Sequence, residues 1–374
     1  MRIAYLIAGT YNSGGMERVL ANKANFLVSH GYEVIIITTD QRGQKPFFPL
    51  DQRIKCYDLG INYEENNGKS FFNKVMHYPF KQWEHKKRLS ELLNKLHADV
   101  VVSMFCNDAS ILPQIKDGSK KVLEVHFSRF KRLQYGRKGL WKWADKWRSN
   151  NDLKVVSRFD RFVVLTKEDK MYWGNLHNIQ VIPNARTFAF EKPAELTNKT
   201  VMAVGRYDFQ KGFERLIAAW AEVCSKVSDW KLEIIGDGAL REKMLQQIEE
   251  NGLNDRVVLK KLPAAQMKDA YMNTSIFALS SRFEGLPMVL LEAQAAGVPI
   301  VSFACKCGPK DLIEDGINGF LFEEGDIDGL AKGLIRLIED EELRKKMGKA
   351  AYQNSELYTE NAIMKHWIDL FQNL

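Results

Sequence analysis

The loop GRYDFQKG, residues 205–212, carries two cations whose spacing suits the binding of an anion. An apolar run ends at Gly205, Arg206 and Lys211 follow, and Gly212 opens the amphipathic pattern FERLIAAW. Two cations beside the amino terminus of a helix can form a diphosphate site, because the helix dipole and the free backbone N–H groups add to their charge. The alternative is a pair of solvated surface cations.

The stretch SRFEGLPMVLLEA contains a second candidate, a carboxylate within an apolar helix. Pro287 suits the first turn of a helix and Gly297 its end, and only Glu292 and Gln294 are polar between them. Such a helix is buried, and a buried carboxylate needs hydrogen-bond donors or a cation. A pair of sugar hydroxyls would supply the donors. A structural arginine or a backbone partner is the alternative.

Glu284 stands in the loop just before this helix, next to Gly285. The first backbone N–H groups of a helix have no partner within the helix and point into the same space. Glu284 is therefore expected to face the part of the ligand that lies next to the group bound by Glu292.

A glycine-bearing loop near the amino terminus, GTYNSGGMERVL, follows the same order of strand, loop and helix. Gly14 and Gly15 let the backbone approach a ligand and leave its N–H groups accessible, although a plain tight turn is also compatible. The spacing is not GxGxxG, and in IIGDGALREKM Arg241 replaces the third glycine. The fingerprint of nicotinamide and flavin binding is therefore absent.

Strands and helices that could position these residues alternate along the whole chain. The pattern predicts strands near 2–8, 33–39, 53–58, 99–105, 121–126, 160–166, 179–182, 200–204, 231–236, 256–261, 275–280, 298–303 and 319–322. Strand–helix alternation predicts an α/β protein with doubly wound parallel sheets. Ligands bind such sheets at the carboxyl ends of their strands.

A length of 374 residues exceeds what one hydrophobic core usually fills, so two Rossmann-like domains are expected. The segment 187–200, with Pro193 and a polar cluster, is the best linker candidate. We predict domains at 1–188 and 195–355. The tail 356–374 is amphipathic, and it either caps the second domain or packs on the first. If the two ligand-binding edges face each other, the active site is a central cleft.

Composition and charge restrict the class of protein further. No apolar run is long enough for a membrane span, and the amino terminus lacks a signal-peptide pattern, so a cytoplasmic protein is expected. The five cysteines are scattered and predict reduced, mostly buried thiols. Residues 1–188 hold 31 Lys and Arg against 18 Asp and Glu, so the first half is where an anionic partner would bind.

Five motifs, in order, resemble glycosyltransferase family 4, and together they span essentially the whole chain. They are the Gly-Gly-Met-Glu-Arg loop, VVLTKEDKMYW with VIPN, GRYDFQKG, SRFEGLPMVLLEAQAAGVPIV and GPKDLIEDGINGFLF. The resemblance implies a GT-B fold, two Rossmann-like domains facing a cleft, and a retaining enzyme that uses nucleotide-activated sugars.

The resemblance also implies roles for residues of the second half. Arg206 and Lys211 match the cations that bind the donor diphosphate. Glu292 matches the glutamate that holds the ribose hydroxyls, and Glu284 matches the one that contacts the donor sugar. By the same resemblance, the backbone of Gly285, Leu286 and Pro287 lies near the hydroxyls and the phosphate of the donor sugar. The turn at Leu262 and Pro263 falls where the backbone of the family recognises the base of the nucleotide.

In the first half, the resemblance implies that the loop at Gly14 and Gly15 closes over the diphosphate and sugar. His126, at the end of KVLEVHF, matches a histidine near the reacting carbon of the donor. Taken alone, a histidine at a strand end is more often structural. Thr166 and Asn184 only support the resemblance.

Two features set this chain apart from the family pattern. Cys305, Lys306 and Cys307 precede the glycine of GPKDL, and IPNA lacks the glycine that commonly follows the asparagine. Asp326-Ile-Asp328 superficially resembles the metal-binding DxD of another glycosyltransferase fold, but it precedes a helical pattern and is expected to cap that helix. We expect that the protein requires no metal ion and no other cofactor. Arg206 and Lys211 would supply the positive charge that a metal ion supplies in other enzymes.

A basic and aromatic segment, residues 128–150, has eight Lys and Arg against one acid. Leu140, Trp143, Ala144 and Trp147 fall at helical spacing, and segment 69–88 is also basic and aromatic. Such helices suit an anionic membrane interface, so peripheral attachment to the inner face of the cytoplasmic membrane is one interpretation. Tryptophans packed inward beneath a solvated basic face are another. Nucleic-acid binding is a third interpretation, but no recognised nucleic-acid-binding module accompanies these segments. We therefore expect no nucleic-acid partner.

These observations favour a retaining glycosyltransferase. We expect it to move a hexose or N-acetylhexosamine from a nucleoside-diphosphate sugar, best fitted by UDP, to a hydroxyl of a lipid-linked or polysaccharide glycan. A sugar-nucleotide epimerase of the same fold is one alternative, and a non-catalytic membrane-binding module is another. The donor sugar, the acceptor and the linkage are left open by the sequence.

Overall fold

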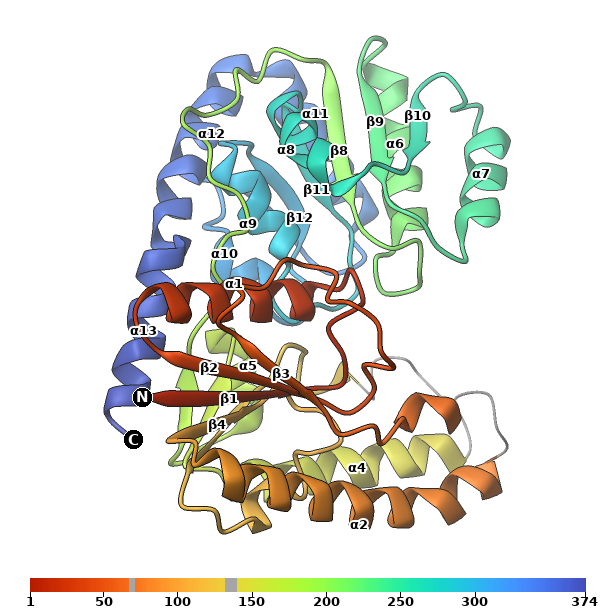
Figure 1. The fold of residues 1–374 in the computed structure, drawn as a ribbon. Coiled ribbons are helices and arrows are strands. Elements are labelled where there is room, and N and C mark those ends of the chain that lie inside the picture. Colours follow the sequence, from red (N-terminus) through yellow and green to blue (C-terminus); the bar gives the residue numbers. More distant parts are fainter. Residues whose placement is uncertain (67–70, 132–139) are drawn as a thin grey trace. The chain divides into compact units, whose positions relative to one another are not determined.

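A computed structural model describes residues 1–66, 71–131 and 140–374 (Figure 1). The chain divides into two compact units, each built on one parallel sheet. The first unit comprises residues 1–165, 170–182 and 364–374, and the second comprises 166–169 and 183–363.

The first unit has a seven-stranded sheet in the order β3-β2-β1-β4-β5-β6-β7, with every neighbouring pair parallel. Its strands are β1 (Arg2–Ile7), β2 (Glu33–Thr38), β3 (Lys55–Asp58), β4 (Val100–Ser103), β5 (Lys120–Glu124), β6 (Arg161–Val164) and β7 (Ile179–Val181). The central strands are apolar and buried along their length, as expected where helices cover both faces.

Within the described part of the chain, the α-helices that accompany this sheet are α1 (Gly15–Ser29), α2 (Phe71–Leu96), α4 (Leu140–Val156), α5 (Lys167–Trp173) and α13 (Glu360–Gln372). Figure 1 shows α1 on one face of the sheet and α2 and α4 on the other. Two short 3₁₀ turns, η1 (Tyr63–Asn66) and η2 (Leu112–Gln114), lie in its loops. Residues 364–374 of α13 and the chain end belong to this unit, and the side chain of Trp367 is buried in it.

The second unit has a six-stranded sheet in the order β10-β9-β8-β11-β12-β13, also parallel. Its strands are β8 (Thr200–Val204), β9 (Lys231–Ile235), β10 (Val257–Lys260), β11 (Ile276–Leu279), β12 (Ile300–Phe303) and β13 (Gly319–Phe322). Its α-helices are α6 (Phe213–Lys226), α7 (Arg241–Glu250), α8 (Met267–Met272), α9 (Met288–Ala295), α10 (Pro309–Leu312), α11 (Ile327–Glu339) and α12 (Glu341–Ser355), and its 3₁₀ turns are η3 (Ala264–Gln266) and η4 (Glu356–Tyr358).

The core of the second unit forms between the sheet and the apolar faces of its helices. Helix α6 packs against α7 and α11, while α9 packs against α12. Trp220 of α6 is fully buried in this core, together with Leu330 and Leu334 of α11. These side chains recur at helical spacing, which is why the amphipathic pattern predicts the helices.

The strands expected from the sequence are all present, so the α/β prediction with two parallel, Rossmann-like sheets is confirmed. Apart from residues 166–169, which belong to the second unit, the chain passes between the units at Ile182–Pro183, before the segment 187–200, and again at Ile363–Met364. Asp326 caps α11, as expected, by accepting a hydrogen bond from the N–H of Gly329 at 2.9 Å. Among the described residues, no helix combines the length and the hydrophobicity that crossing a membrane requires.

Candidate functional site

The loop between β8 and α6 brings the candidate cations to the carboxyl edge of the second sheet. Gly212 lies at the start of α6 with a φ of 60°, and a Cβ there would meet the carbonyl oxygen of Ser280. Gly205 is equally constrained, because a Cβ there would meet the aliphatic carbons of Lys211. Gly205 therefore lets the Lys211 side chain run back along the loop, and Gly212 lets the start of α6 approach the backbone of Ser280.

Lys211 and Glu284 form an ion pair in this edge. The Nζ of Lys211 lies 2.7 Å from Oε1 of Glu284, and the two side chains are 14% and 7% exposed. Ser281 donates a hydrogen bond to the same Oε1 at 2.6 Å, and Gln210 donates one to Oε2 at 3.4 Å. A cation and an anion that are 73 residues apart in sequence thus share one buried position.

Arg206 differs from Lys211 although the two belong to one loop. Its side chain is 74% exposed, and its guanidinium lies 3.2 Å from Asp208. Asp208 also accepts a hydrogen bond from the N–H of Lys211 at 3.2 Å. The structure therefore places both cations at the predicted edge, with Lys211 held in place and Arg206 projecting into solvent.

Glu284, Gly285, Leu286 and Pro287 form the approach to α9. The N–H of Glu284 donates to the carbonyl of Lys306 at 3.0 Å, which ties this loop to the segment after β12. Pro287 is the N-cap of α9 rather than its first helical residue, a difference of one position from the sequence prediction. The cause is local, since its ψ of 97° is extended rather than helical.

Glu292 lies on α9 and is buried, as the apolar pattern predicts. Its Oε2 accepts a hydrogen bond from the hydroxyl of Tyr271, a fully buried residue of α8, at 2.8 Å. A tyrosine hydroxyl is thus one structural partner of this carboxylate. Glu284 pairs with Lys211, whereas Glu292 accepts from Tyr271, so different groups hold the two carboxylates.

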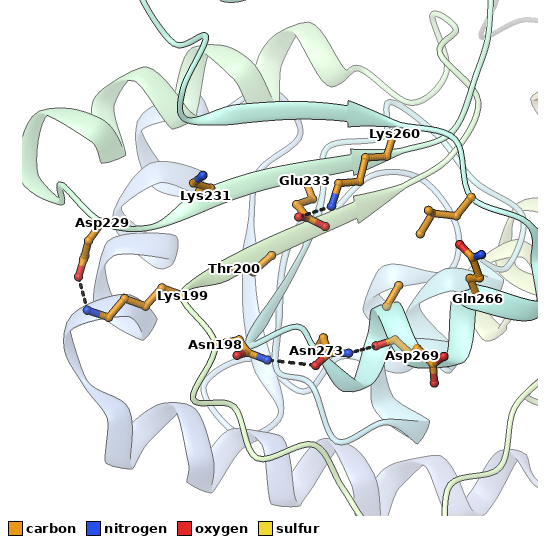
Figure 2. Close-up of a pocket in the computed structure, with 12 residues that line it drawn as sticks. Asn198, Lys199, Thr200, Asp229, Lys231, Glu233, Lys260, Gln266, Asp269 and Asn273 are labelled. Atoms are coloured by element: carbon orange, nitrogen blue, oxygen red, sulfur yellow. Dashed lines mark hydrogen bonds and ion pairs between the residues drawn. The ribbon is translucent and has the colours of Figure 1, made fainter.

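Leu262 and Pro263 follow β10, and Pro263 is the N-cap of η3. Leu262 lines an open cavity of about 660 Å³, whose other walls come from β8, β9, β10 and α8 (Figure 2). Two ion pairs are drawn there, Lys260 with Glu233 at 2.5 Å and Lys199 with Asp229. The cavity is lined by none of Arg206, Lys211, Glu284 and Glu292, so it is separate from the predicted diphosphate site.

In the first unit, Gly14 is the N-cap of α1 and Gly15 its first residue. A Cβ on Gly14 would meet the carboxylate of Glu17, whereas Gly15 has open space around it. His126 follows the end of β5, and its Nε2 lies 3.1 Å from Oε1 of Glu124. The structure therefore places all three residues at the carboxyl edge of the first sheet.

Thr166 and Asn184 are both buried, and both belong to the second unit. Thr166 accepts a hydrogen bond from the N–H of Asp169 at 3.0 Å, in the first turn of α5. Thr166 therefore has a structural role.

Cys307, one of the two departures from the family pattern, has a positive φ of 65°. Its N–H donates to Glu168 at 2.8 Å, and Lys310 lies 3.0 Å from the same carboxylate. Cys305 is buried, and burial raises the pKa of its thiol well above the ordinary value. All five cysteines are free thiols, as predicted, but the prediction that most are buried is wrong: Cys305 and Cys307 are buried, Cys106 and Cys224 are partly buried, and Cys56 is exposed.

The sequence reasoning missed several partners of these residues. Gln210 and Ser281 contact Glu284, yet neither has a spacing that marks it. Lys23, on α1, was also missed; it is buried, and a lysine is rarely fully buried unless it is paired. A lone lysine within the apolar positions of a helical pattern is the signal that could have found it.

Asp108, after β4, is a buried carboxyl group with an unusual environment. Its Oδ2 has no hydrogen-bond partner among the described residues, and burial raises its pKa to about 6. Because the folded state holds this proton more tightly, the resulting stability is fully present below the unfolded pKa of 3.8 and is lost as pH rises through about 6.

We therefore expect Asp108→Asn to raise the free energy of unfolding by about 2–3 kcal/mol at pH 7.5 and to change it little at pH 4. Urea unfolding at both pH values measures this difference. Asp255→Asn, at an exposed position, is the control. A gain of the same size at both pH values would contradict the assignment.

Two family models match consecutive parts of the chain. The model of glycosyltransferase family 4 matches residues 13–186, and that of glycosyl transferases group 1 matches residues 185–354. An uncharacterized glycosyltransferase of Haemophilus influenzae is 32% identical over 374 residues, covering 98% of each chain. The amylovoran biosynthesis glycosyltransferase AmsD of Erwinia amylovora is 28% identical, covering 99% of each.

Solved glycosyltransferases have the same fold. Staphylococcus aureus TarM, in a complex with UDP, has a TM-score of 0.76 at 17% identity, with 99% of each chain covered. Anabaena HepE, in a complex with UDP and glucose, has a TM-score of 0.75 at 16% identity, with all of each chain covered. These likenesses support the GT-B fold, and the sequence matches carry the assignment further: this chain belongs to glycosyltransferase family 4.

Proposed function

We propose that the protein transfers a hexose or N-acetylhexosamine from a UDP-sugar, with retention of configuration, to a hydroxyl of a lipid-linked or polysaccharide glycan. The observation that carries this proposal is the buried Lys211–Glu284 pair beside the start of α6. An ammonium group held at a helix amino terminus suits a diphosphate, and a carboxylate next to it suits the hydroxyls of the attached sugar.

Glu284 and Lys211 change partners when the donor binds, in this proposal. The donor diphosphate takes the charge of Lys211, with Arg206 moving from Asp208 to add a second cation. The carboxylate of Glu284 then accepts hydrogen bonds from sugar hydroxyls. The backbone of Gly285, Leu286 and Pro287 contacts the sugar and phosphate, and Gly14 and Gly15 close over them.

Glu292 holds the ribose in this proposal, and the backbone at Leu262 and Pro263 reads the base. Tyr271 donates to one oxygen of this carboxylate, and the carboxylate also accepts the hydrogen bonds of the ribose hydroxyls when the donor binds. Two hydroxyl donors satisfy a carboxylate without neutralising it, which is the requirement at a buried position.

The named relatives support the acceptor class. They include a lipopolysaccharide 1,6-galactosyltransferase of Salmonella typhimurium, 27% identical and covering 91% of this chain. A Campylobacter jejuni relative, 27% identical over 99% of this chain, acts on an undecaprenol-linked glycan. These relatives are named for different sugars and different linkages. The proposal therefore specifies a class of acceptor and not one particular acceptor.

In the reaction we propose, the acceptor oxygen bonds to the anomeric carbon as the bond from that carbon to the phosphate oxygen breaks. The leaving UDP takes the acceptor proton on the same face of the sugar. Lys211 and Arg206 stabilise the charge that develops on the diphosphate, so no metal ion is required. In this proposal His126, from the first unit, acts next to the anomeric carbon at which the bond breaks.

A panel of labelled sugar nucleotides tests the proposal, because such enzymes can hydrolyse their donor slowly before any acceptor is known. We expect one UDP-sugar to release UDP above the rate of the protein-free control. Release of nucleotide from none of the donors, or conversion of a sugar nucleotide to its epimer, would contradict the proposed transfer.

Peripheral membrane binding is a second component of the proposal, and exposed aromatic residues of the first unit favour it. Phe80 and Trp83 on α2 are 62% and 59% exposed and stack at 6.1 Å, and Lys87 lies 5.7 Å from the Trp83 ring. Trp147 on α4 is 62% exposed, so this tryptophan does not pack inward. The other positions of the predicted stripe lie outside the described side chains, and residues 132–139 lie outside the described residues.

We expect the protein to float with phosphatidylglycerol vesicles and not with phosphatidylcholine vesicles. Trp83→Ala/Trp147→Ala should abolish flotation, and Lys87→Ala should lower the partition coefficient about fivefold, the equivalent of about 1 kcal/mol for one surface cation. Leu357→Ala removes an exposed apolar side chain of the second unit and is the matched control. Equal flotation of the double variant and the wild type would rule out these side chains as the anchor.

A further inference from the structure

A cluster of buried charges lies beneath His126 at the carboxyl edge of the first sheet. The Nζ of Lys23, on α1, lies 2.6 and 2.7 Å from the two oxygens of Glu124, the last residue of β5. Oε1 of Glu124 is also 3.1 Å from Nε2 of His126. The side chains of Lys23 and Glu124 are 5% and 0% exposed, so one carboxylate links a buried ammonium group to the imidazole.

The position of Lys23 is further fixed by an aromatic cage. Its Nζ lies 3.6 Å from the ring centroid of Trp367 on α13 and 5.9 Å from that of Tyr5 on β1. A cation over aromatic faces away from solvent is strongly attracted to them. The carboxyl-terminal helix thus contributes an aromatic ring to the cluster.

Opposite charges determine the ionisation of Glu124. Burial acts to raise the pKa of Glu124, but Lys23 and His126 together outweigh burial and lower that pKa to about 2. The carboxylate is therefore ionised and can only accept hydrogen bonds. Glu17, on the first turn of α1, also interacts electrostatically with His126, and Tyr5 is a further titratable group near Glu124.

We propose that Glu124 is a positioning residue for His126 and that Lys23, held by Trp367, fixes Glu124. This proposal rests on the proposed function, in which His126 acts next to the reacting carbon. The physical step is simple: an acceptor-only carboxylate next to Nε2 favours the tautomer that carries its proton there. Nδ1 is then the ring atom that accepts a hydrogen bond from substrate or water.

The contact is close but oblique, since Nε2 lies within 3.1 Å of Glu124 without the direction of a well-aligned hydrogen bond. Hydrogen bonds of catalytic groups often tighten only when the ligand binds. We therefore expect the preference for one tautomer to be clear in the free protein and stronger with UDP present.

The direct test is nitrogen-15 NMR of histidine-labelled full-length protein, with His126→Gln identifying the signal. In the pH range where the ring is neutral, we expect the wild-type signal to show the proton on Nε2. Lys23→Met/Glu124→Gln removes both charges, so it avoids leaving one buried charge unpaired. This variant should lose the tautomer preference while keeping its thermal unfolding temperature within a few degrees of the wild type.

Activity measurements show whether the positioning matters. The double variant should lower kcat about 10–100-fold, the range found when partners that orient a histidine are removed, with KM for the donor and affinity for UDP unchanged. Tyr5→Phe is the control, because it removes a hydroxyl with no hydrogen-bond partner among the described residues. An unchanged tautomer, or a changed tautomer with unchanged kcat, would overturn the proposal.

The two proposals fail differently. If the wild type neither binds UDP nor releases it from any donor, the proposed function fails, whereas the NMR signal of His126 still decides whether Glu124 positions the ring. If donor turnover is normal and the NMR signal does not respond to the double variant, only the role of Lys23 and Glu124 is lost.

Discussion

Replacing Lys211 by alanine lowers kcat/KM for the donor by about 10²–10³-fold, the loss typical of removing one group that stabilises charge in a transition state. Lys211 is the better-fixed of the two cations, since it is largely buried and bonded to Glu284, whereas Arg206 is mostly exposed. A positioned charge needs no reorganisation when the diphosphate leaves. Arg206→Ala should therefore have the smaller effect of the two.

Released UDP, measured over a range of donor concentrations, gives the two kinetic constants for this comparison. Lys199→Ala is the matched control, because Lys199 is a solvent-exposed lysine of the same unit, paired with Asp229 just before β8 rather than beyond its carboxyl end. Lys211→Ala also leaves Glu284 without its cation, so thermal unfolding must be measured alongside. A fully folded Lys211→Ala protein with wild-type kcat/KM would contradict the proposed role.

Replacing Glu292 by glutamine lowers UDP affinity by about 100-fold, because hydrogen bonds to a charged acceptor contribute about 1.5–3 kcal/mol each. Tyr271→Phe separates this role from a structural one. It removes the hydroxyl 2.8 Å from Glu292 and keeps the carboxylate, so it should cost about 1 kcal/mol of stability and leave UDP affinity within a few-fold.

Deoxy-UDP sharpens the same prediction. If Glu292 accepts hydrogen bonds from the ribose, the wild type should bind 2′-deoxy-UDP more weakly than UDP by calorimetry, and Glu292→Gln should bind the two with similar affinity. Equal discrimination by the wild type and the variant would show that the buried carboxylate is structural.

The fold could be predicted because its determinants are local. The β-branched runs of β1 and β2 and the apolar spacing of α6 report secondary structure within a few residues. The sequence does not determine where the tail 356–374 packs, because the pattern of an amphipathic helix shows that one face is buried but not against which surface. In the structure, burial of Trp367 and its contact with Lys23 join it to the first unit.

The site could be predicted only in part, because its pairings are tertiary. Gly212, Lys211 and Glu292 were recognised from residue types beside turns and within an apolar helix. The pairing of Lys211 with Glu284 and of Lys23 with Glu124 joins residues 73 and 101 positions apart, which no local spacing reports. The exposure of Arg206 was equally hidden, since both cations of GRYDFQKG look alike in sequence.

The central claim is that the second unit binds a nucleoside diphosphate through Lys211 and Glu292. Isothermal titration of the full-length protein with UDP tests it most directly, because it requires neither donor sugar nor acceptor. We predict saturable binding of UDP by the wild type and the Lys199→Ala control, with strongly weakened binding by Lys211→Ala and Glu292→Gln. No UDP binding by the wild type, or equal binding by all four proteins, would contradict the claim.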